Sequence, residues 1–378
     1  MPRPTAPVAA DGKPAYRPFG TLRTALALLV LLSHAVEVSP IGQYAPEGLR
    51  YGPIAVFVFF ALSGFVITEA ALAFYRGRAG SFLANRIVRL YPPYAFALVV
   101  AIVLLLCSGG PFLDPAWRQW RNVIANFLAI FPSVPLTDRL LGVHQRVDIV
   151  SIIWAVRIEF AFYLVVAAAL AWDRLARGRS RRIVNAQSVG WLVLALHVLT
   201  FYGTPGDGRL AFYLQFAPHF VVGVAAAMRE NGAPRAMSWL AGAALLLATA
   251  QAVAYPDPSG LAAVHQWAAD SRHLSPIILY LALMLVFWRL GVARGGSPRW
   301  LRLDRRFGEY SYPIYLLQIP ALYFVQWTMM ARHGSPHPLN LLLMVVPTVV
   351  LAWVVVTASE RLLDPLRRRL RRHALPSS

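Results

Sequence analysis

The feature that most constrains this 378-residue chain is its series of apolar runs, most of them about as long as a bilayer is thick. A helix needs roughly 20 mainly apolar residues to cross a hydrocarbon core. Such runs recur along the whole sequence, and segments of alternating polarity do not. We therefore predict an all-α integral membrane protein, a polytopic bundle of about ten transmembrane helices. The predicted spans are Leu22–Val38, Gly52–Phe74, Tyr94–Ser108, Ile149–Trp172, Val189–Tyr202, Leu210–Met228, Trp239–Tyr255, Leu274–Leu290, Tyr310–Met330 and Leu339–Leu362.

Composition agrees with a membrane protein and limits the kinds of binding partner that we expect. The chain is 58% hydrophobic and 14% charged, whereas a soluble domain is about half apolar and a quarter charged. Its net charge of +19 would suggest nucleic acid in a soluble protein. Here the charge lies in short segments between apolar runs, which indicates cytoplasmic loops and lipid head groups instead. We expect membrane lipids and no nucleic acid as partners. Cys107, the only cysteine, is interpreted as a small buried hydrophobic residue.

The basic segments also predict a topology. Arginines concentrate after the second, fourth and eighth spans and in the C-terminal tail. All four segments fall on the cytoplasmic side if the N-terminus is inside and ten spans alternate. We expect both termini in the cytoplasm and the protein in the inner (plasma) membrane. Residues 1–20 are predicted as a cytoplasmic tail, 21–363 as the membrane domain and 364–378 as a basic tail. Residues 122–131 are too few to cross and predict an interfacial or re-entrant helix.

The first span carries two charged or titratable residues on one face. His34 follows Arg23 by eleven positions, which is about 20° more than three full turns and about 16 Å along the axis. Such residues are expensive in an apolar helix and are functional candidates. His34 is either a general base or a histidine hydrogen-bonded between helices. Glu37, one turn further, either orients the imidazole or is an interfacial charge.

Two further sets of charges are candidates. Glu159 lies deep in the fourth predicted span with Tyr163 four positions later. It belongs to a reaction site or forms an ion pair with a basic residue, for example Arg157. Arg86 and Arg89 form R-x-x-R in the basic segment after the second span. They are either ordinary cytoplasmic charge or a bidentate clamp for phosphates.

Other patterns point to packing rather than chemistry. Ser63 and Gly64 lack the flanking residues of a nucleophile elbow. They indicate close helix packing or a backbone break that lines a cavity. No cysteine–histidine cluster is present in the sequence, so no metal site is predicted. Five histidines are expected in outer loops: His144, His265, His273, His333 and His337.

The charged residues belong to five stretches with characteristic spacing. They are arginine-x10-histidine at Arg23 and His34, VFFALSGFVIT at Val58–Thr68, RIVRLYPPY at Arg86–Tyr94, W-x4-E-x3-Y at Trp154, Glu159 and Tyr163, and GEYSYPIYL at Gly308–Leu316. In this order they resemble the motifs of acyltransferase family 3, integral-membrane acyltransferases that modify cell-envelope and exported glycans. The resemblance covers most of the chain. Where the late motif of the family usually continues to a histidine, this chain has Gln318.

The resemblance implies an O-acyltransferase. Its donor is acyl-CoA, commonly acetyl-CoA, and its acceptor is a hydroxyl of a glycan or lipid-linked saccharide. His34 is expected to be the general base, with Arg23 as a structural or donor-side cation. We expect the membrane domain alone to complete the transfer, without a metal. The site residues it implies are His34, Arg23 and Glu159 for catalysis, and Arg86, Arg89, Tyr91 and Ser63 for the cosubstrate.

Other functions stay open at this point. A transporter or flippase of a glycan or lipid-linked intermediate would also use buried charges and a broken helix. The same enzyme class could use succinyl or longer acyl donors, or act on a small metabolite. A structural or sensing membrane protein is the third alternative. Only the enzymes predict coenzyme A release that depends on His34.

Overall fold

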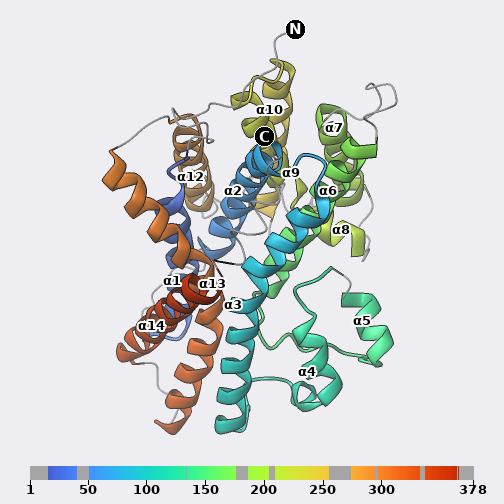
Figure 1. The fold of residues 1–378 in the computed structure, drawn as a ribbon. Coiled ribbons are helices and arrows are strands. Elements are labelled where there is room, and N and C mark those ends of the chain that lie inside the picture. Colours follow the sequence, from blue (N-terminus) through green and yellow to red (C-terminus); the bar gives the residue numbers. More distant parts are fainter. Residues whose placement is uncertain are drawn as a thin grey trace. The chain divides into compact units, whose positions relative to one another are not determined.

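The computed structural model describes residues 16–40, 51–132, 134–175, 186–203, 209–254, 274–293, 297–332, 337–363 and 365. Every regular element within these ranges is a helix (Figure 1). Seven of the described helices are long and apolar enough to cross a membrane, and Ala186–Phe201 and Ile277–Val292 are shorter apolar helices. This confirms the predicted all-α, multi-pass membrane protein. The cytoplasmic position of the termini stays a prediction.

The described helices follow the predicted spans in order. They are α1 (Gly20–Glu37), α2 (Tyr51–Phe74), α3 (Ala79–Ser108), α4 (Trp120–Phe127), α5 (Val134–Leu141), α6 (Ile153–Leu175), α7 (Ala186–Val198), α8 (Arg209–Leu214), α9 (Ala217–Glu230), α10 (Ala236–Ala254), α12 (Leu274–Val292), α13 (Pro298–Ala331) and α14 (Leu339–Leu362). Short 3-10 and π segments cover Pro115–Arg118 and Leu199–Gly203. Most of the predicted tails 1–20 and 364–378, together with His265, His273 and His333, lie outside the described residues.

Two helices begin well before the spans predicted for them. α3 starts at Ala79 rather than Tyr94, and α13 starts at Pro298 rather than Tyr310. Hydropathy marks where a helix becomes apolar, whereas the helix itself extends as far as its backbone bonds allow. As a result, the basic segment with Arg86 and Arg89 forms the first turns of α3.

Two other predicted spans have different bounds. The span predicted for Leu210–Met228 is interrupted, because α8 ends at Leu214 and α9 begins at Ala217, with Pro218 in its first turn. α6 begins at Ile153, four residues later than predicted. The short helix predicted for residues 122–131 is present as α4, and its depth in the membrane is untested.

The chain divides into two compact units, and each is assembled from separate stretches. The first comprises Met1–Leu26, Pro53–Phe82 and Val165–Gly308, and the second comprises Ala27–Gly52, Leu83–Leu164 and Glu309–Ser378. Five helices contribute residues to both units: α1, α2, α3, α6 and α13.

In the first unit, Asp304 of α13 caps the first turn of α1. Its carboxylate accepts hydrogen bonds from the backbone N–H of Gly20 at 2.8 Å and of Thr21 at 2.7 Å. It also accepts from the hydroxyls of Thr21 and Tyr16, both at 2.7 Å. The first N–H groups of a helix have no partner inside the helix, so this distant carboxylate satisfies two of them. Burial, followed by the hydrogen bond to Asp304, raises the pKa of Tyr16 above its ordinary value.

A buried arginine joins other helices of the same unit. The side chain of Arg17 is 3% exposed and lies 3.3 Å from Glu69 of α2 and 3.6 Å from Glu230 of α9. Its guanidinium also donates to the carbonyl of Ala293 at 3.4 Å and lies over the ring of Phe65. Two carboxylates and a carbonyl thus offset the cost of burying this cation.

Helices α2 and α9 pack backbone to backbone. A Cβ added at Gly64 would lie 2.3 Å from the carbonyl oxygen of Phe220, and one added at Gly223 would lie 2.0 Å from that of Ala61. Only glycine permits this approach. Close packing, one of the two interpretations of Ser63 and Gly64, is therefore what the structure has at Gly64.

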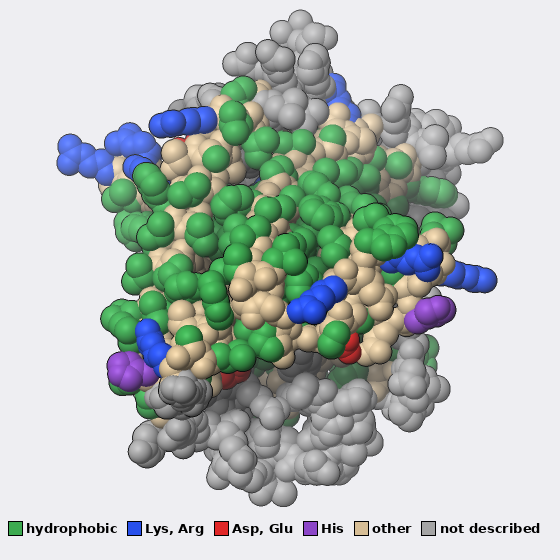
Figure 2. Space-filling view, turned by 90° about the horizontal axis from the view of Figure 1, so that it is seen from below, with side chains coloured by type: hydrophobic (Ala, Val, Ile, Leu, Met, Phe, Trp, Pro, Cys, Tyr) green, Lys and Arg blue, Asp and Glu red, His purple; other side chains and the backbone are tan. Residues whose placement is uncertain are grey.

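Apolar side chains cover much of the surface. Figure 2 shows many hydrophobic side chains on the viewed face, with a few basic side chains among them. Exposed examples include Trp239 at 78%, Leu246 at 72% and Leu106 at 66%. Soluble proteins rarely expose apolar surface on this scale, whereas lipid tails solvate it.

Candidate functional site

His34 lies in the second unit, on the last turns of α1, and its side chain is partly exposed. Its Nδ1 lies 3.1 Å from Oε1 of Gln318, which belongs to α13. Glu37, one of the groups considered as the partner of the imidazole, is exposed. The structure therefore gives Nδ1 a neutral amide partner from a residue far away in the sequence.

Gln318 is held in turn by the late motif. The side chain of Gln318 is fully buried, and its Nε2 donates a hydrogen bond to the carbonyl of Tyr315 at 2.8 Å. The hydroxyl of Tyr315 donates to the carbonyl of Ile152 at 3.1 Å. Because α6 begins only at Ile153, this carbonyl precedes the helix that carries Glu159. The late motif thus connects His34 to the start of α6.

The arginine segment joins the same unit through α3. Arg86 is buried, and its guanidinium lies over the ring of Tyr163, 5.8 Å from the ring centroid. The carbonyl of Leu90, in the same segment, accepts a hydrogen bond from the hydroxyl of Tyr312 at 3.0 Å. Arg89 also acts electrostatically on Tyr163. The R-x-x-R pair, the late motif and α6 are therefore neighbours.

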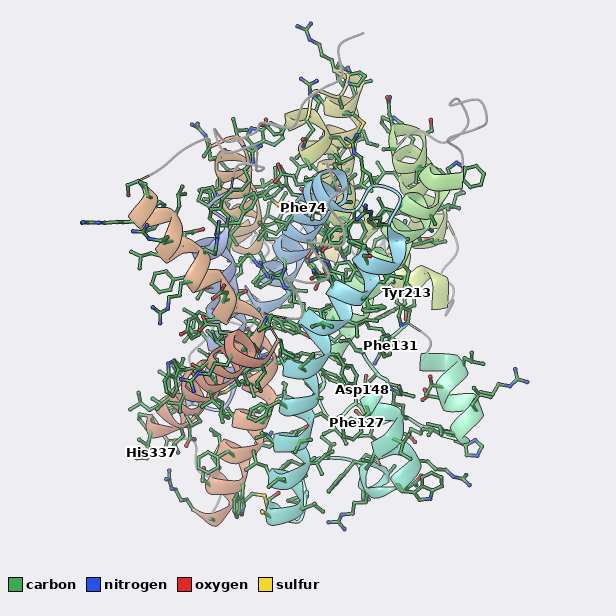
Figure 3. All side chains as sticks on the ribbon, viewed as in Figure 1. Phe74, Phe127, Phe131, Asp148, Tyr213 and His337 are labelled. Atoms are coloured by element: carbon green, nitrogen blue, oxygen red, sulfur yellow. The ribbon has the colours of Figure 1, made fainter. Side chains whose placement is uncertain are left out.

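Glu159 and Tyr163 interact on one face of α6. The phenol of Tyr163 donates to Oε1 of Glu159 at 2.5 Å, across one helical turn. Tyr312 of α13 interacts electrostatically with both residues. Arg157, considered earlier as an ion-pair partner for Glu159, bonds instead to Asp148 at 3.2 Å and to the carbonyl of Ala129 at 2.8 Å. Asp148 is labelled in Figure 3.

Aromatic rings line the segment after R-x-x-R. The ring of Tyr91 stacks on that of Phe131, with centroids 6.3 Å apart, and Phe131 packs edge-on against Phe160 at 5.0 Å. Phe131 is labelled in Figure 3. Tyr94 donates a hydrogen bond to the carbonyl of Asn126 in α4. These contacts place Tyr91 in the second unit with Arg86 and Glu159.

The remaining candidates belong to the first unit. Arg23 lies on α1, is partly exposed and acts electrostatically on Tyr16. Ser63 lies on α2 beside the close contact that Gly64 makes with α9. Among the described residues, no group of three or more histidine, cysteine, aspartate or glutamate side chains could hold a metal ion. His144 and His337 lie outside helices, as predicted, and their side of the membrane is untested.

Gln318 is the residue of this site whose contact the sequence did not reveal. Its position just after the late motif was evident, but the motif identifies no partner 284 positions away. The helical spacing offers one signal, because Gln318 follows Tyr315 by three positions and so shares its face of α13.

The sequence matches one family model and several curated proteins. A family model described as "Acyltransferase domain" matches residues 19–357. The chain is 28% identical to the "O-acetyl transferase" of Shigella phage Sf6 over 166 residues, 40% of this chain and 45% of that protein. It is 29% identical to "Acyltransferase MdmB" of Streptomyces mycarofaciens, over 33% of this chain and 30% of that protein. It is 25% identical to "Nodulation protein 10" of Rhizobium leguminosarum bv. viciae, over 47% of this chain and 51% of that protein.

These matches are partial. The chain spans about half the length or less of the three curated relatives it matches. No solved structure matches it.

Proposed function

The chain belongs to acyltransferase family 3, and from this premise we propose that it is a membrane O-acyltransferase. It moves an acyl group, which we propose to be acetyl, from acyl-CoA to a hydroxyl of a cell-surface or exported glycan. The name of the phage relative, "O-acetyl transferase", supports an oxygen acceptor and an acetyl group. The proposed location is the inner membrane, with membrane lipids around the protein.

One observation carries the proposal: within the second unit, three of the five motif stretches have members in contact, and His34 of a fourth stretch contacts Gln318, two residues beyond the late motif. His34 contacts Gln318, next to the late motif, and Tyr312 of that motif contacts Leu90 of the arginine segment. Arg86 contacts Tyr163 of the W-x4-E-x3-Y pattern. Residues from α1, α3, α6 and α13 gather in this way when they serve one site.

In the proposed mechanism, His34 is the general base. Nε2 of His34 takes the proton of the acceptor hydroxyl while its oxygen attacks the thioester carbonyl carbon. A C–O bond forms, the C–S bond breaks, and the coenzyme A thiolate leaves and takes the proton from the imidazolium. The products are the O-acyl ester and coenzyme A, so atoms and charge balance. Positioning and one general base suffice because a thiolate is a good leaving group.

The cosubstrate needs cations and an aromatic surface. Arg86, Arg89 and Tyr91 lie on α3, and we assign them to the coenzyme A side of the site. Arg86 has a second role, because it also contacts Tyr163, which is bonded to Glu159. Arg23, as a structural or donor-side cation, and Ser63, as a cosubstrate contact, belong to the first unit and stay predictions from the family resemblance.

The test of the proposal is His34→Ala, with His144→Ala as the control. His144 is an exposed histidine outside the helices, so its loss should change nothing. We expect the rate of coenzyme A release to fall about 100-fold or more in the His34 variant, because a general base contributes a rate factor of this size. The wild-type gene and each variant are returned to a deletion strain. Acetyl-CoA turnover is measured in membrane vesicles of these strains, and their envelope glycans are analysed by mass spectrometry.

The outcomes separate the alternatives. The transferase is supported if the wild-type gene restores the glycan modification in the deletion strain and the His34 variant, at equal protein level, does not. The mass difference then identifies the acyl group. Full restoration by the His34 variant would show that His34 only packs between helices. If deletion changes no glycan and no coenzyme A is released with any acyl donor, the transporter becomes the better explanation.

A further inference from the structure

The contact between His34 and Gln318 defines which ring nitrogen is which. Nδ1 of His34 faces Oε1 of Gln318 at 3.1 Å. An amide oxygen only accepts hydrogen bonds, so it requires a proton on the nitrogen that it meets. The direction of this hydrogen bond therefore depends on how the amide of Gln318 is turned.

The orientation of that amide is fixed by a second bond. Nε2 of Gln318 donates to the carbonyl of Tyr315 at 2.8 Å. If the amide were reversed, its oxygen would face that carbonyl oxygen, and two acceptors would oppose each other without a proton between them. Because Gln318 is fully buried, a mispaired acceptor would be costly. Only one orientation satisfies both partners.

We propose that Gln318 is the positioning residue that keeps the proton of neutral His34 on Nδ1 and leaves the lone pair on Nε2. This inference rests on the proposed function of His34 as general base. The lone pair on Nε2 is then available to the acceptor hydroxyl at all times when the ring is neutral. Gln318 need not touch either substrate, because it acts through His34.

Other contacts hold the two helices that carry this pair. On α13, Tyr312 and Tyr315 are bonded to backbone carbonyls of Leu90 and Ile152. On α14, Nδ2 of Asn340 donates to the carbonyl of Val38, just beyond the end of α1, at 3.0 Å. These bonds restrain the parts of α1 and α13 that present His34 and Gln318, which suits a residue whose task is orientation.

A neutral amide differs from a carboxylate in this place. It fixes the tautomer but adds no negative charge to stabilise the protonated ring. Within the second unit, the other ionisable side chains of α1, α2, α13 and α14 are Glu37 on α1, Tyr51 on α2, and Glu309, Tyr310, Tyr312, Tyr315 and Tyr323 on α13; on α14 they are Glu360 and Arg361 near its end. The hydrogen-bond partner of the ring is the amide alone among the described residues.

Two substitutions separate positioning from packing. Gln318→Leu removes the amide, and we expect kcat to fall about tenfold or more while the KM for acetyl-CoA stays unchanged. Gln318→Glu keeps an acceptor for Nδ1, loses the hydrogen bond to the carbonyl of Tyr315 and adds a negative charge. This charge stabilises the protonated ring. A higher pH is then needed to free the base, so the acid limb of the pH profile should move up by about 1 unit or more.

The chain provides a matched control on the same helix. Gln326 lies two turns beyond Gln318 on α13, and its Oε1 accepts no hydrogen bond from the described residues. Gln326→Leu makes the same chemical change and should leave kcat and the pH profile as in wild type. Vesicles that contain each variant are supplied with acetyl-CoA, and coenzyme A release is followed from pH 5.5 to 9 at equal amounts of folded protein.

Each result bears on the proposal. A shifted acid limb in Gln318→Glu, with a lower kcat in Gln318→Leu, supports it. An unshifted limb, or equal losses in the two leucine variants, would overturn it and leave His34 as the base. Wild-type activity in His34→Ala would remove the proposed role of His34 as general base, and this inference with it.

Discussion

At the scale of single residues, sequence spacing predicted the charged residues of the candidate site but not all of their hydrogen-bond partners. His34, Arg86 and Glu159 were evident because ionisable residues are costly in apolar helices and therefore conspicuous. The contacts of Gln318 and Asp304 were not evident, since each residue acts on another more than 280 positions away. A neutral glutamine and a carboxylate beside many arginines give no local signal of such a contact.

Asp304 gives a prediction at this scale. Asp304→Ala removes the acceptor for two backbone N–H groups of α1 and for two hydroxyls. We expect a loss of about 2 kcal/mol in stability, because buried donors are left unsatisfied. Thermal unfolding in detergent, followed by size-exclusion chromatography, measures it.

The control for this variant is Asp114→Ala. Asp114 also caps a helix, but it is exposed and accepts one hydrogen bond, from the N–H of Ala116 at 2.8 Å. Water can replace that bond, so its loss should cost less. Equal unfolding temperatures for the two variants would show that Asp304 is not a structural cap.

At the scale of helices, hydropathy predicted the order of elements better than their ends. Seven predicted spans appear as long apolar helices among the described residues. The starts of α3 and α13 were missed because polar turns continue an apolar helix without a break. The interruption between α8 and α9 was missed because the apolar run continues across it. Contacts between helices, such as the one made by Thr24 with the carbonyl of Phe307, leave no periodic signal.

The contact between α2 and α9 gives a prediction at this scale. Gly223→Ala would place a Cβ 2.0 Å from the carbonyl of Ala61 and force the two helices apart. We expect a lower unfolding temperature and less folded protein, since backbone cannot yield as a side chain can. Gly242→Ala on α10 meets nothing within 4 Å, and alanine favours a helix over glycine by about 1 kcal/mol. This control should therefore be neutral or stabilising; a similar loss in both variants would contradict the packing argument.

At the scale of the whole molecule, the remaining prediction is the orientation in the membrane. The arginine-rich segments predict that the turn between α2 and α3 is cytoplasmic and that the segments before α6 and α14 lie outside. Cys107, the only cysteine, is exposed and not buried as predicted, so replacing it by serine gives a background for single-cysteine labelling. Cysteines are then introduced one at a time as Arg78→Cys, His144→Cys and His337→Cys.

A membrane-impermeant maleimide should label the variants at 144 and 337 in intact spheroplasts, and the variant at 78 only after permeabilisation. If Arg78 is inside, the C-terminal end of α2 is cytoplasmic and its N-terminal end is outside. α1 must then run from the cytoplasm to the outside, so the N-terminus is inside as well. If His337 is outside, α14 returns the chain to the cytoplasm, where the basic tail would meet anionic head groups. The reverse labelling pattern would invert the chain and move the arginine end of α3 to the outer side. Acyl-CoA could not reach Arg86 and Arg89 from the cytoplasm in that case, and the proposed donor side would be wrong.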